Sequence, residues 1–408
     1  MHESCRGNIG SFSPLNSMVL YMLQVGAKNS GSKIKNIFKH CTPPHPSLLA
    51  CVVVPAKDEG GTIVKTLNAL RKQLFKDGSK LSSSIYEVIL LANNCTDDTF
   101  KKAKNFALKY PGFNLHVVEA IFTKKQSNIG YVRRILMDEA CYRLNLNGIQ
   151  NGIIASTDGD TKVDKYWLGN IIAEIANGND AVGGRILTDD IDPKARLYYL
   201  RDITYRILMA KAAAKIDRED NNPWPCHHQY FGASLAVTCG MYDYCGRLPG
   251  VPHLEDMALY NALIKVDAKI RCSPAVKVYT SGRTDGRVAI GFSEQLKKWA
   301  LFNTNNIPQI VEPAASILIK FKCKRILRKC FEIHQSGNNI PTLLTRIIAS
   351  NLAIDQQWLC DKIASSSYFG ALWQDTEEAV CAGYFYENYP GVDITEAISE
   401  LRVFFNAP

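Results

Sequence analysis

An apolar run leads directly into two carboxylates in the stretch Gly152-Ile153-Ile154-Ala155-Ser156-Thr157-Asp158-Gly159-Asp160. A β-strand of this composition would carry both carboxylates out of a hydrophobic core to one edge of a sheet. Because Asp158 and Asp160 flank a residue without a side chain, they can converge on one hard cation such as Mg²⁺ or Mn²⁺. A cation held there has open positions for a diphosphate. Taken alone, however, short acidic pairs at strand ends are usually solvated turn residues.

Outward from this stretch, short apolar runs alternate with segments of helical periodicity. The first run ends at Pro55, and Ile63, Leu67 and Leu70 then recur at i, i+4 and i+7, which predicts a helix. Strands alternating with helices of about 10–15 residues are typical of a doubly wound, mostly parallel sheet, which binds ligands outside the carboxyl ends of its strands. The predicted strands are 48–54, 88–91, 115–118, 152–155, 181–184 and 276–279, and the predicted helices are 63–70, 100–110, 130–144 and 167–176.

The two ends of the chain have a different character. Residues 1–47 are rich in Ser, Gly, Asn and Lys and finish in a proline-rich segment, which is typical of an extension. Beyond about residue 305, strand patterns give way to helical ones. We therefore expect an α/β domain over residues 48–304 and a helical C-terminal region over 305–408. The helical segments of that region are 343–359, 376–386 and 395–404.

Composition excludes several classes of protein. With 46% hydrophobic and 21% charged residues, the 408-residue chain predicts a packed globular core rather than disorder. No apolar run reaches the roughly 18 residues that a membrane span needs. The 13 cysteines include no Cys-x-x-Cys pair, so a zinc site is not indicated. Their odd number and scatter favour a reducing cytoplasm over a disulfide framework, and we expect a cytoplasmic protein.

The net charge of +9 favours an anionic partner. We do not expect nucleic acid, because no basic stripe interleaved with aromatic residues and no nucleic-acid motif is present. Phosphate-bearing substrates are one alternative. A membrane surface is another, because residues 316–331 interleave apolar and basic side chains in a pattern that suits a helix lying on anionic lipid. The same pattern also fits an ordinary amphipathic helix on a protein surface.

Five motifs lie at strand ends and helix starts of this pattern. Besides Asp158-Gly159-Asp160, the motifs are Val53-Val54-Pro55-Ala56-Lys57-Asp58-Glu59, Ala92-Asn93-Asn94-Cys95-Thr96-Asp97-Asp98-Thr99, Asn128-Ile129-Gly130-Tyr131-Val132-Arg133-Arg134 and His253-Leu254-Glu255-Asp256-Met257-Ala258-Leu259. A dinucleotide-binding oxidoreductase would instead need Gly-x-Gly-x-x-Gly after the first strand, where this chain has an acidic turn. The order and spacing of the five motifs resemble glycosyltransferase family 2, with the GT-A fold, over about residues 48–295.

The resemblance implies a hexosyltransferase that uses a UDP- or GDP-sugar, a hydroxyl acceptor and Mg²⁺ or Mn²⁺. It places Pro55, Lys57, Glu59 and Asn93 around the base and ribose. The turn 92–95 departs from the Asp-Asp-Gly-Ser type common in the family, so an amide stands where a carboxylate usually reads the base.

The resemblance also implies the roles of the acidic motifs. Asp160 would bind the cation, while Asp158 would contact ribose or metal-bound water. Asp256 would act as the base of a single displacement with inversion, and Glu255 would orient the acceptor. Arg133 and Arg134 begin a predicted helix, where adjacent residues diverge by about 100°. Only one of them can therefore face the donor, and we assign Arg134.

Two further segments resemble one bacterial branch of the family. His228 and Gly232 lie in a His-x-x-x-Gly-Ala segment, where Gly232 would let substrate approach the backbone. His228, or its neighbour His227, would bond sugar hydroxyls or phosphate. Arg283 and Arg287 lie in an Arg-x-x-Gly-Arg loop that suits a diphosphate clamp. No histidine follows that would complete the metal site, as one does in other GT-A enzymes.

Three alternatives stay open at this stage. The first is a retaining transferase on the same fold, with an acceptor of the phosphoglycerate type. The second is a nucleotidyltransferase, which needs a basic, glycine-rich first loop where this chain has Asp58 and Glu59. The third is a non-catalytic module that binds nucleotide-sugars.

Overall fold

The chain divides into two compact units. A computed structural model describes residues 37–149, 151–282 and 291–406. Within these residues, one unit takes the chain up to residue 192 and again over 219–296, and the other takes 193–218 and everything from 297 onward. The domain boundaries expected from the sequence stay a prediction. The first unit is here called the sheet unit, and the second the helical unit.

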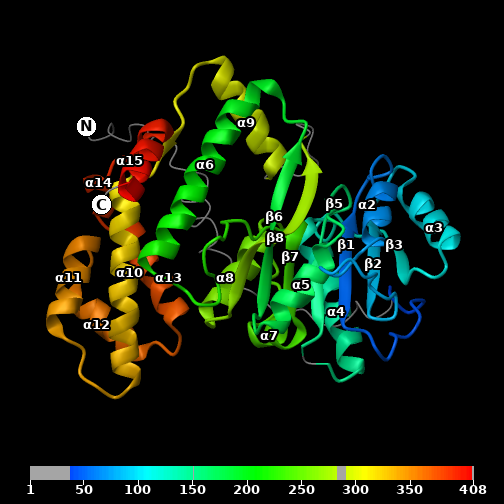
Figure 1. The fold of residues 1–408 in the computed structure, drawn as a ribbon, viewed down its shortest axis with the longest axis horizontal. Helices are drawn as coiled ribbons and strands as arrows, with labels where there is room; N and C mark the ends of the chain where they lie inside the picture. Colours follow the sequence, from blue (N-terminus) through cyan, green and yellow to red (C-terminus); the bar gives the residue numbers. More distant parts are fainter. Residues whose placement is uncertain (1–36, 150, 283–290, 407–408) are drawn as a thin grey trace, which may run out of the picture. The chain divides into compact units, whose positions relative to one another are not determined.

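An eight-stranded sheet forms the centre of the sheet unit (Figure 1). Its order is β3-β2-β1-β4-β7-β6-β8-β5. All pairs are parallel except those of β7 with β4 and β6 and that of β5 with β8, which confirms the predicted mostly parallel sheet. The strands are β1 (Ala50–Ala56), β2 (Tyr86–Asn93), β3 (Leu115–Ala120), β4 (Ile153–Ser156), β5 (Lys162–Val163), β6 (Ala181–Asp189), β7 (Leu235–Thr238) and β8 (Ile270–Ser281).

Helices cover both faces of this sheet. Side chains alternate along a strand, so Cys51 and Val53 of β1 join one core while Val52 and Val54 join the other. This doubly wound arrangement confirms the predicted fold class. Residues of α4 (Ile129–Leu146), α7 (Cys239–Tyr244) and α8 (Glu255–Lys265) line the first core, and residues of α2 (Ile63–Leu70), α3 (Thr99–Lys109) and α5 (Trp167–Ala176) line the second.

Parallel pairing brings the predicted motifs to one edge of the sheet. The register sets Ala56 of β1 opposite Ala92 of β2, and Val53 of β1 opposite Ser156 of β4. The turns that follow β1, β2 and β4 therefore begin side by side at the carboxyl ends of the three strands, where an open α/β sheet binds its ligands.

The helical unit confirms the helical C-terminal region expected from the sequence. It also contains α6 (Pro193–Ile216), which the sequence analysis did not predict, and β9 (Ile310–Val311) pairs with β10 (Val392–Asp393). Helix α9 (Phe292–Thr304) crosses the division between the two units. The remaining helices are α10 (Ala314–Gln335), α11 (Thr342–Leu352), α12 (Gln356–Ser365), α13 (Phe369–Ala382), α14 (Phe385–Asn388) and α15 (Ile394–Asn406).

The amphipathic pattern of residues 316–331 is explained by packing inside the helical unit. Buried residues of α10, including Cys323 and Leu327, join a core with α11, α12 and α13. Several of its basic residues form ion pairs: Lys320 lies 2.7 Å from Glu312, and Arg328 lies 2.8 Å from Asp217. The apolar side that a lipid surface would require is thus used within the protein. In the described part of the chain, no helix combines the length and the apolar character needed to cross a membrane.

A buried ionic cluster fixes β2, β3 and α4 to one another. Glu87 of β2 is fully buried and accepts hydrogen bonds of 2.7 and 2.8 Å from Arg143 of α4. His116 of β3 lies 3.1 Å from the same carboxylate. Burial alone would raise the pKa of Glu87, but the hydrogen bonds from Arg143 and His116 outweigh it and lower the pKa to about 2. The charged form of Glu87 is therefore the one that stabilises the fold.

The substitution E87Q is expected to reduce the free energy of unfolding by about 3–5 kcal/mol at pH 7, because it removes the closest counter-charge of the buried Arg143 and leaves the more distant Glu139, at 3.9 Å. Since the pKa of Glu87 is lowered from 4.5, its stabilising effect is complete above that value. The gap between wild type and E87Q should therefore narrow as the pH falls from about 4.5 toward 2. Urea unfolding at several pH values measures the gap. The exposed neighbour Glu119 provides the control E119Q, and equal losses in both variants would contradict the prediction.

Candidate active site

The turn that follows β4 is fixed in place by its central glycine. The carbonyl of Gly159 accepts a hydrogen bond of 3.0 Å from Thr66 of α2. A Cβ added at Gly159 would lie 3.1 Å from Cγ of Glu59 and 3.3 Å from the carbonyl oxygen of Pro55, so the turn packs closely against the end of β1. Asp158 and Asp160 are thereby presented at the sheet edge, each partly exposed.

One buried arginine joins this turn to the acidic pair. Arg133 of α4 is 4% exposed. Its Nη2 donates to Oδ1 of Asp158 at 2.8 Å, and its Nε donates to Oε1 of Glu255 at 2.9 Å. Its Nη1 donates to the carbonyl of Gly232 at 3.1 Å and also to the hydroxyl of Ser156. The guanidinium therefore spans two motifs that are about a hundred residues apart in the sequence.

Two glycines make room for this arrangement. A Cβ added at Gly232 would lie 2.7 Å from Cζ of Arg133, so the guanidinium fills the space that the sequence analysis assigned to substrate. A Cβ added at Gly130 would lie 1.8 Å from the carbonyl oxygen of Val251. Helix α4 thus begins in direct contact with the loop before α8, and any side chain at Gly130 would push them apart.

The acidic pair forms the first turn of α8. Glu255 is 4% exposed, whereas Asp256 is half-buried and keeps some access to solvent. Oδ2 of Asp256 accepts a hydrogen bond of 2.8 Å from the amide of Gly232. Burial raises the pKa of both carboxyl groups above their ordinary values, although Arg133 opposes the shift at each of them. A carboxylate of raised pKa that is still accessible is suited to accept a proton from an incoming hydroxyl.

Acidic side chains connect the turns after β1 and β2 through hydrogen bonds to backbone amides. Oδ1 of Asp58 accepts from the amide of Thr96 at 2.6 Å, and Oδ2 of Asp97 accepts from the amide of Gly60 at 2.8 Å. Both carboxylates are thus engaged in holding one turn against the other. Asp97 also accepts from the amide of Thr99 near the start of α3, at 2.9 Å.

The two asparagines of the turn 92–95 have separate surroundings. Asn94 is in the left-handed region, with φ 48°, and its side chain exchanges hydrogen bonds of 2.9 and 3.1 Å with the backbone of Phe122. It therefore ties the turn to the chain after β3. Asn93 ends β2 and is 5% exposed.

The other predicted residues have diverse positions. Lys57 is exposed, and Glu59 is buried with its carboxylate 2.9 Å from the hydroxyl of Thr62. Arg134 lies 3.8 Å from Asp138, one turn further along α4. His228 is half-buried in the loop before the short 3₁₀ helix η2 (Gly232–Ser234). Arg283 and Arg287 lie outside the described residues.

Arg133 is the residue that the sequence analysis set aside in favour of its neighbour Arg134. Helical periodicity could have found it, because Arg133, Leu136, Met137 and Ala140 recur at i, i+3, i+4 and i+7 and are all buried. Arg134 shares its side of the helix with Asp138 instead. The role expected of Arg134 at the donor stays a prediction, but the contact with the acidic motifs belongs to Arg133.

The turn after β4 offers hard ligands to a divalent cation. Asp158 and Asp160 supply carboxylate oxygens, which suit Mg²⁺ and Mn²⁺. Within the described residues, the clusters with three ligand atoms close together lie elsewhere and contain thiols: Asp58 with Cys95 and Asp97, and Cys141 with Cys239 and Asp243. A cation at the turn would thus take its remaining ligands from the substrate and from water.

Comparison with known protein families identifies a match, which includes part of this site. Residues 51–234 match the family described as glycosyl transferase family 2. The matched segment is thus similar to family 2 glycosyltransferases. It contains the turn after β4, Arg133 and Gly232, while Glu255 and Asp256 follow it in the sequence. No curated protein sequence matches the chain.

Several solved glycosyltransferase structures resemble the chain. The mannosyltransferase PcManGT from Pyrobaculum calidifontis, in complex with GDP-Man and Mn²⁺, has 14% identity and a TM-score of 0.40, covering 95% of this chain and 91% of its own. TarS 1-349 from S. aureus, in complex with UDP, has 13% identity and a TM-score of 0.41, covering 81% and 92%. GalNAc-T7, with UDP, GalNAc and Mn²⁺, has 11% identity and a TM-score of 0.42, covering 84% and 58%.

The substitution R133M should reduce the free energy of unfolding by about 3–5 kcal/mol at pH 7, because Asp158 and Glu255 would lose their buried counter-charge. Burial raises the pKa of Glu255, so this carboxyl group is protonated as the pH falls and then needs no counter-charge; the loss should therefore be smaller near pH 4. Urea unfolding at both pH values measures it. The adjacent variant R134M is the control, since a partly exposed pair contributes only about 0–1 kcal/mol. If R134M cost as much as R133M, the central position assigned to Arg133 would be wrong.

Proposed function

We propose that this protein transfers a sugar from a UDP- or GDP-sugar donor to a hydroxyl acceptor by a single displacement with inversion. One observation supports the proposal above the others: Arg133 holds Asp158 and Glu255 on one guanidinium, with Asp256 next in sequence. A site for the donor diphosphate and a site for a general base are thus brought to the same sheet edge.

Asp256 is the base in this proposal. The amide of Gly232 donates to its Oδ2 at 2.8 Å and fixes the orientation of the carboxylate. The pKa of Asp256 is raised above its ordinary value and so lies closer to neutral pH. A carboxylate accepts a proton more effectively when its pKa is near the pH of the reaction. Glu255 is held by Arg133 and buried, so its part is to position Asp256 and the start of α8 rather than to exchange protons with the acceptor.

The donor is assigned to the turns around the end of β1. Asp158 and Asp160 would hold Mg²⁺ or Mn²⁺, which when bound supplies positive charge to the leaving nucleoside diphosphate. Asn93 is the last residue of β2, and Pro55 is the next-to-last residue of the adjacent strand β1. Lys57 and Glu59 follow β1, and these four residues are proposed to contact the base and ribose. Additional contacts to the diphosphate or the sugar are proposed for the residues Arg134, His228, Arg283 and Arg287.

The substitution D256N tests the base. It keeps the shape of the side chain but removes proton acceptance, so kcat for sugar transfer should fall roughly 100- to 10,000-fold, with little change in donor affinity. Product analysis by NMR also gives the anomeric configuration. Retention of configuration would replace the displacement mechanism with a retaining one. Full activity in D256N would rule out Asp256 as the base, and the exposed residue Asp77 supplies the control D77N.

Metal-dependent binding of nucleotide tests the turn after β4. A thermal-shift titration of UDP and GDP with Mn²⁺ should raise the Tm of wild type, because the ligand binds only the folded chain, and chelation by EDTA should abolish the shift. The variant D160A should lose the Mn²⁺-dependent part of the shift. D77N again serves as the control. A shift that is unaffected by EDTA and by D160A would contradict the metal site, and pyrophosphate release from a nucleoside triphosphate would point to a nucleotidyltransferase.

A further inference from the structure

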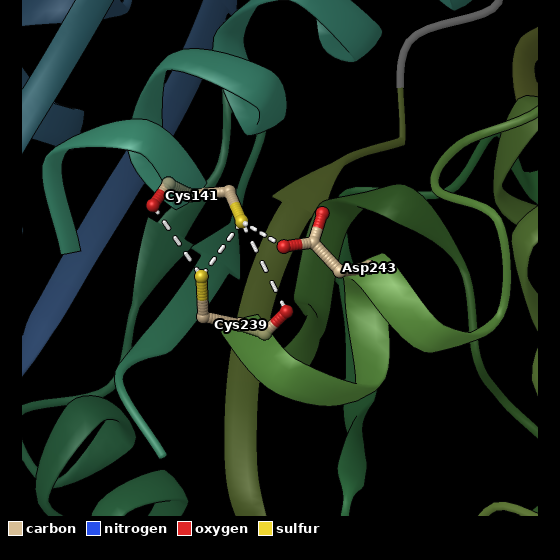
Figure 2. Close-up of side chains that lie close together, drawn as sticks. All are labelled: Cys141, Cys239 and Asp243. Atoms are coloured by element: carbon tan, nitrogen blue, oxygen red, sulfur yellow. Dashed lines mark hydrogen bonds between the residues drawn. The ribbon is translucent and has the colours of Figure 1, made fainter. Parts of the chain in front are cut away.

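Two buried cysteines approach each other away from the acidic motifs of the sheet unit. Cys141 lies on α4, and Cys239 is the first residue of α7; both side chains are fully buried. Their Sγ atoms are 2.6 Å apart (Figure 2). They are 98 positions apart in the sequence, so the fold itself produces this contact.

The separation of the two sulfur atoms distinguishes among the chemistries open to them. Non-bonded heavy atoms are most stable at about 3.5–4.0 Å. Two thiolates bound to one tetrahedral zinc ion, at about 2.3 Å each, are also about 3.8 Å apart. A disulfide bond is about 2.05 Å long. The observed 2.6 Å is closest to the bonded length, so a disulfide requires the smallest movement of the side chains.

The surroundings provide access and a proton acceptor. Oδ2 of Asp243 lies 3.5 Å from Sγ of Cys141, and the same Sγ lies 3.6 Å from Nδ2 of Asn145 (Figure 2 shows Asp243). Both Asp243 and Asn145 are exposed, so the sulfur atoms lie directly beneath the surface. The hydrogen bond from Cys141 lowers the pKa of the Cys239 thiol. Cys239 is therefore the better nucleophile and reacts first with the oxidant, and the thiol of Cys141 reacts second.

We propose that Cys141 and Cys239 form a reversible disulfide bond that links α4 to the start of α7. With hydrogen peroxide as oxidant, the Cys239 thiolate attacks one peroxide oxygen, the O–O bond breaks, and a sulfenic acid and water result. Sγ of Cys141 then attacks the sulfenic sulfur, the S–O bond breaks, and a second water leaves. Two thiols lose two protons and two electrons in total, and one peroxide is reduced to two waters. A small dithiol reverses the bond by exchange.

The bond would stabilise the sheet unit. It closes a long loop of chain, which restricts the unfolded state more than the folded one. It would also attach α4, the helix that carries Arg133, to the segment that follows β7. Since Arg133 lies about two turns before Cys141 on α4, the bond holds the helix near the acidic motifs without touching them.

The experiment compares the full chain after treatment with hydrogen peroxide and after treatment with dithiothreitol. Free thiols are alkylated, and peptides are mapped by mass spectrometry without reduction. We expect a cross-linked peptide that contains Cys141 and Cys239, two hydrogens lighter than the sum of its parts, and absent after dithiothreitol. Oxidation should raise the Tm by roughly 5–15 °C. The variants C141A and C239A should lose this rise, whereas C323A, which removes a buried cysteine of the helical unit, should keep it.

Other outcomes would overturn the proposal. Alkylation of both cysteines in the oxidised wild-type chain, or a cross-link from either one to a different cysteine, would do so whatever the stability of the variants. Tight binding of one Zn²⁺ by the reduced chain, lost in both C141A and C239A and unaccompanied by a cross-link after peroxide treatment, would show instead a metal site formed with Asp243. Either result is independent of whether the protein transfers sugars.

Discussion

The ion pairs of Arg133 are the contact on which the candidate site depends. Removing a guanidinium from water is costly unless charges and hydrogen bonds replace its hydration. Here Asp158 and Glu255 supply the charges, and Gly232 and Ser156 supply further acceptors. These partners lie on three segments, so the buried cation fixes the relative positions of the end of β4 with the turn after it, the 3₁₀ helix η2 and the start of α8.

The same contact leaves the site with an excess of negative charge. One guanidinium faces Asp158, Glu255 and Asp256, and Asp160 lies on the same turn as Asp158. This excess and burial together explain why the pKa of Asp256 is raised although a cation is near. A diphosphate would add further negative charge. In the proposed function, a divalent cation on the turn would offset this charge.

The sequence predicts the framework of the sheet unit well, because buried parallel strands are continuous apolar runs that need no partner to be recognised. The antiparallel strand β7 was missed, since it is only four residues long and lies within the segment analysed for its histidine motif. Helix α6 was also missed. Helix α6 belongs to the same compact unit as the C-terminal helices because it contacts residues that are distant from it in the sequence. No local sequence pattern predicts such contacts.

Two pairs of adjacent residues of the same type show where the sequence suffices and where it does not. For Arg133 and Arg134 the helical periodicity carried the answer, because only one of two neighbours can share a face with buried residues. For Asn93 and Asn94 no such periodicity exists at a strand end. The structure distinguishes the two residues, because the side-chain amide of Asn94 forms hydrogen bonds with the backbone of Phe122. An amide that binds the backbone on both its donor and its acceptor side is committed to holding the turn, so recognition of a base at this turn would fall to Asn93.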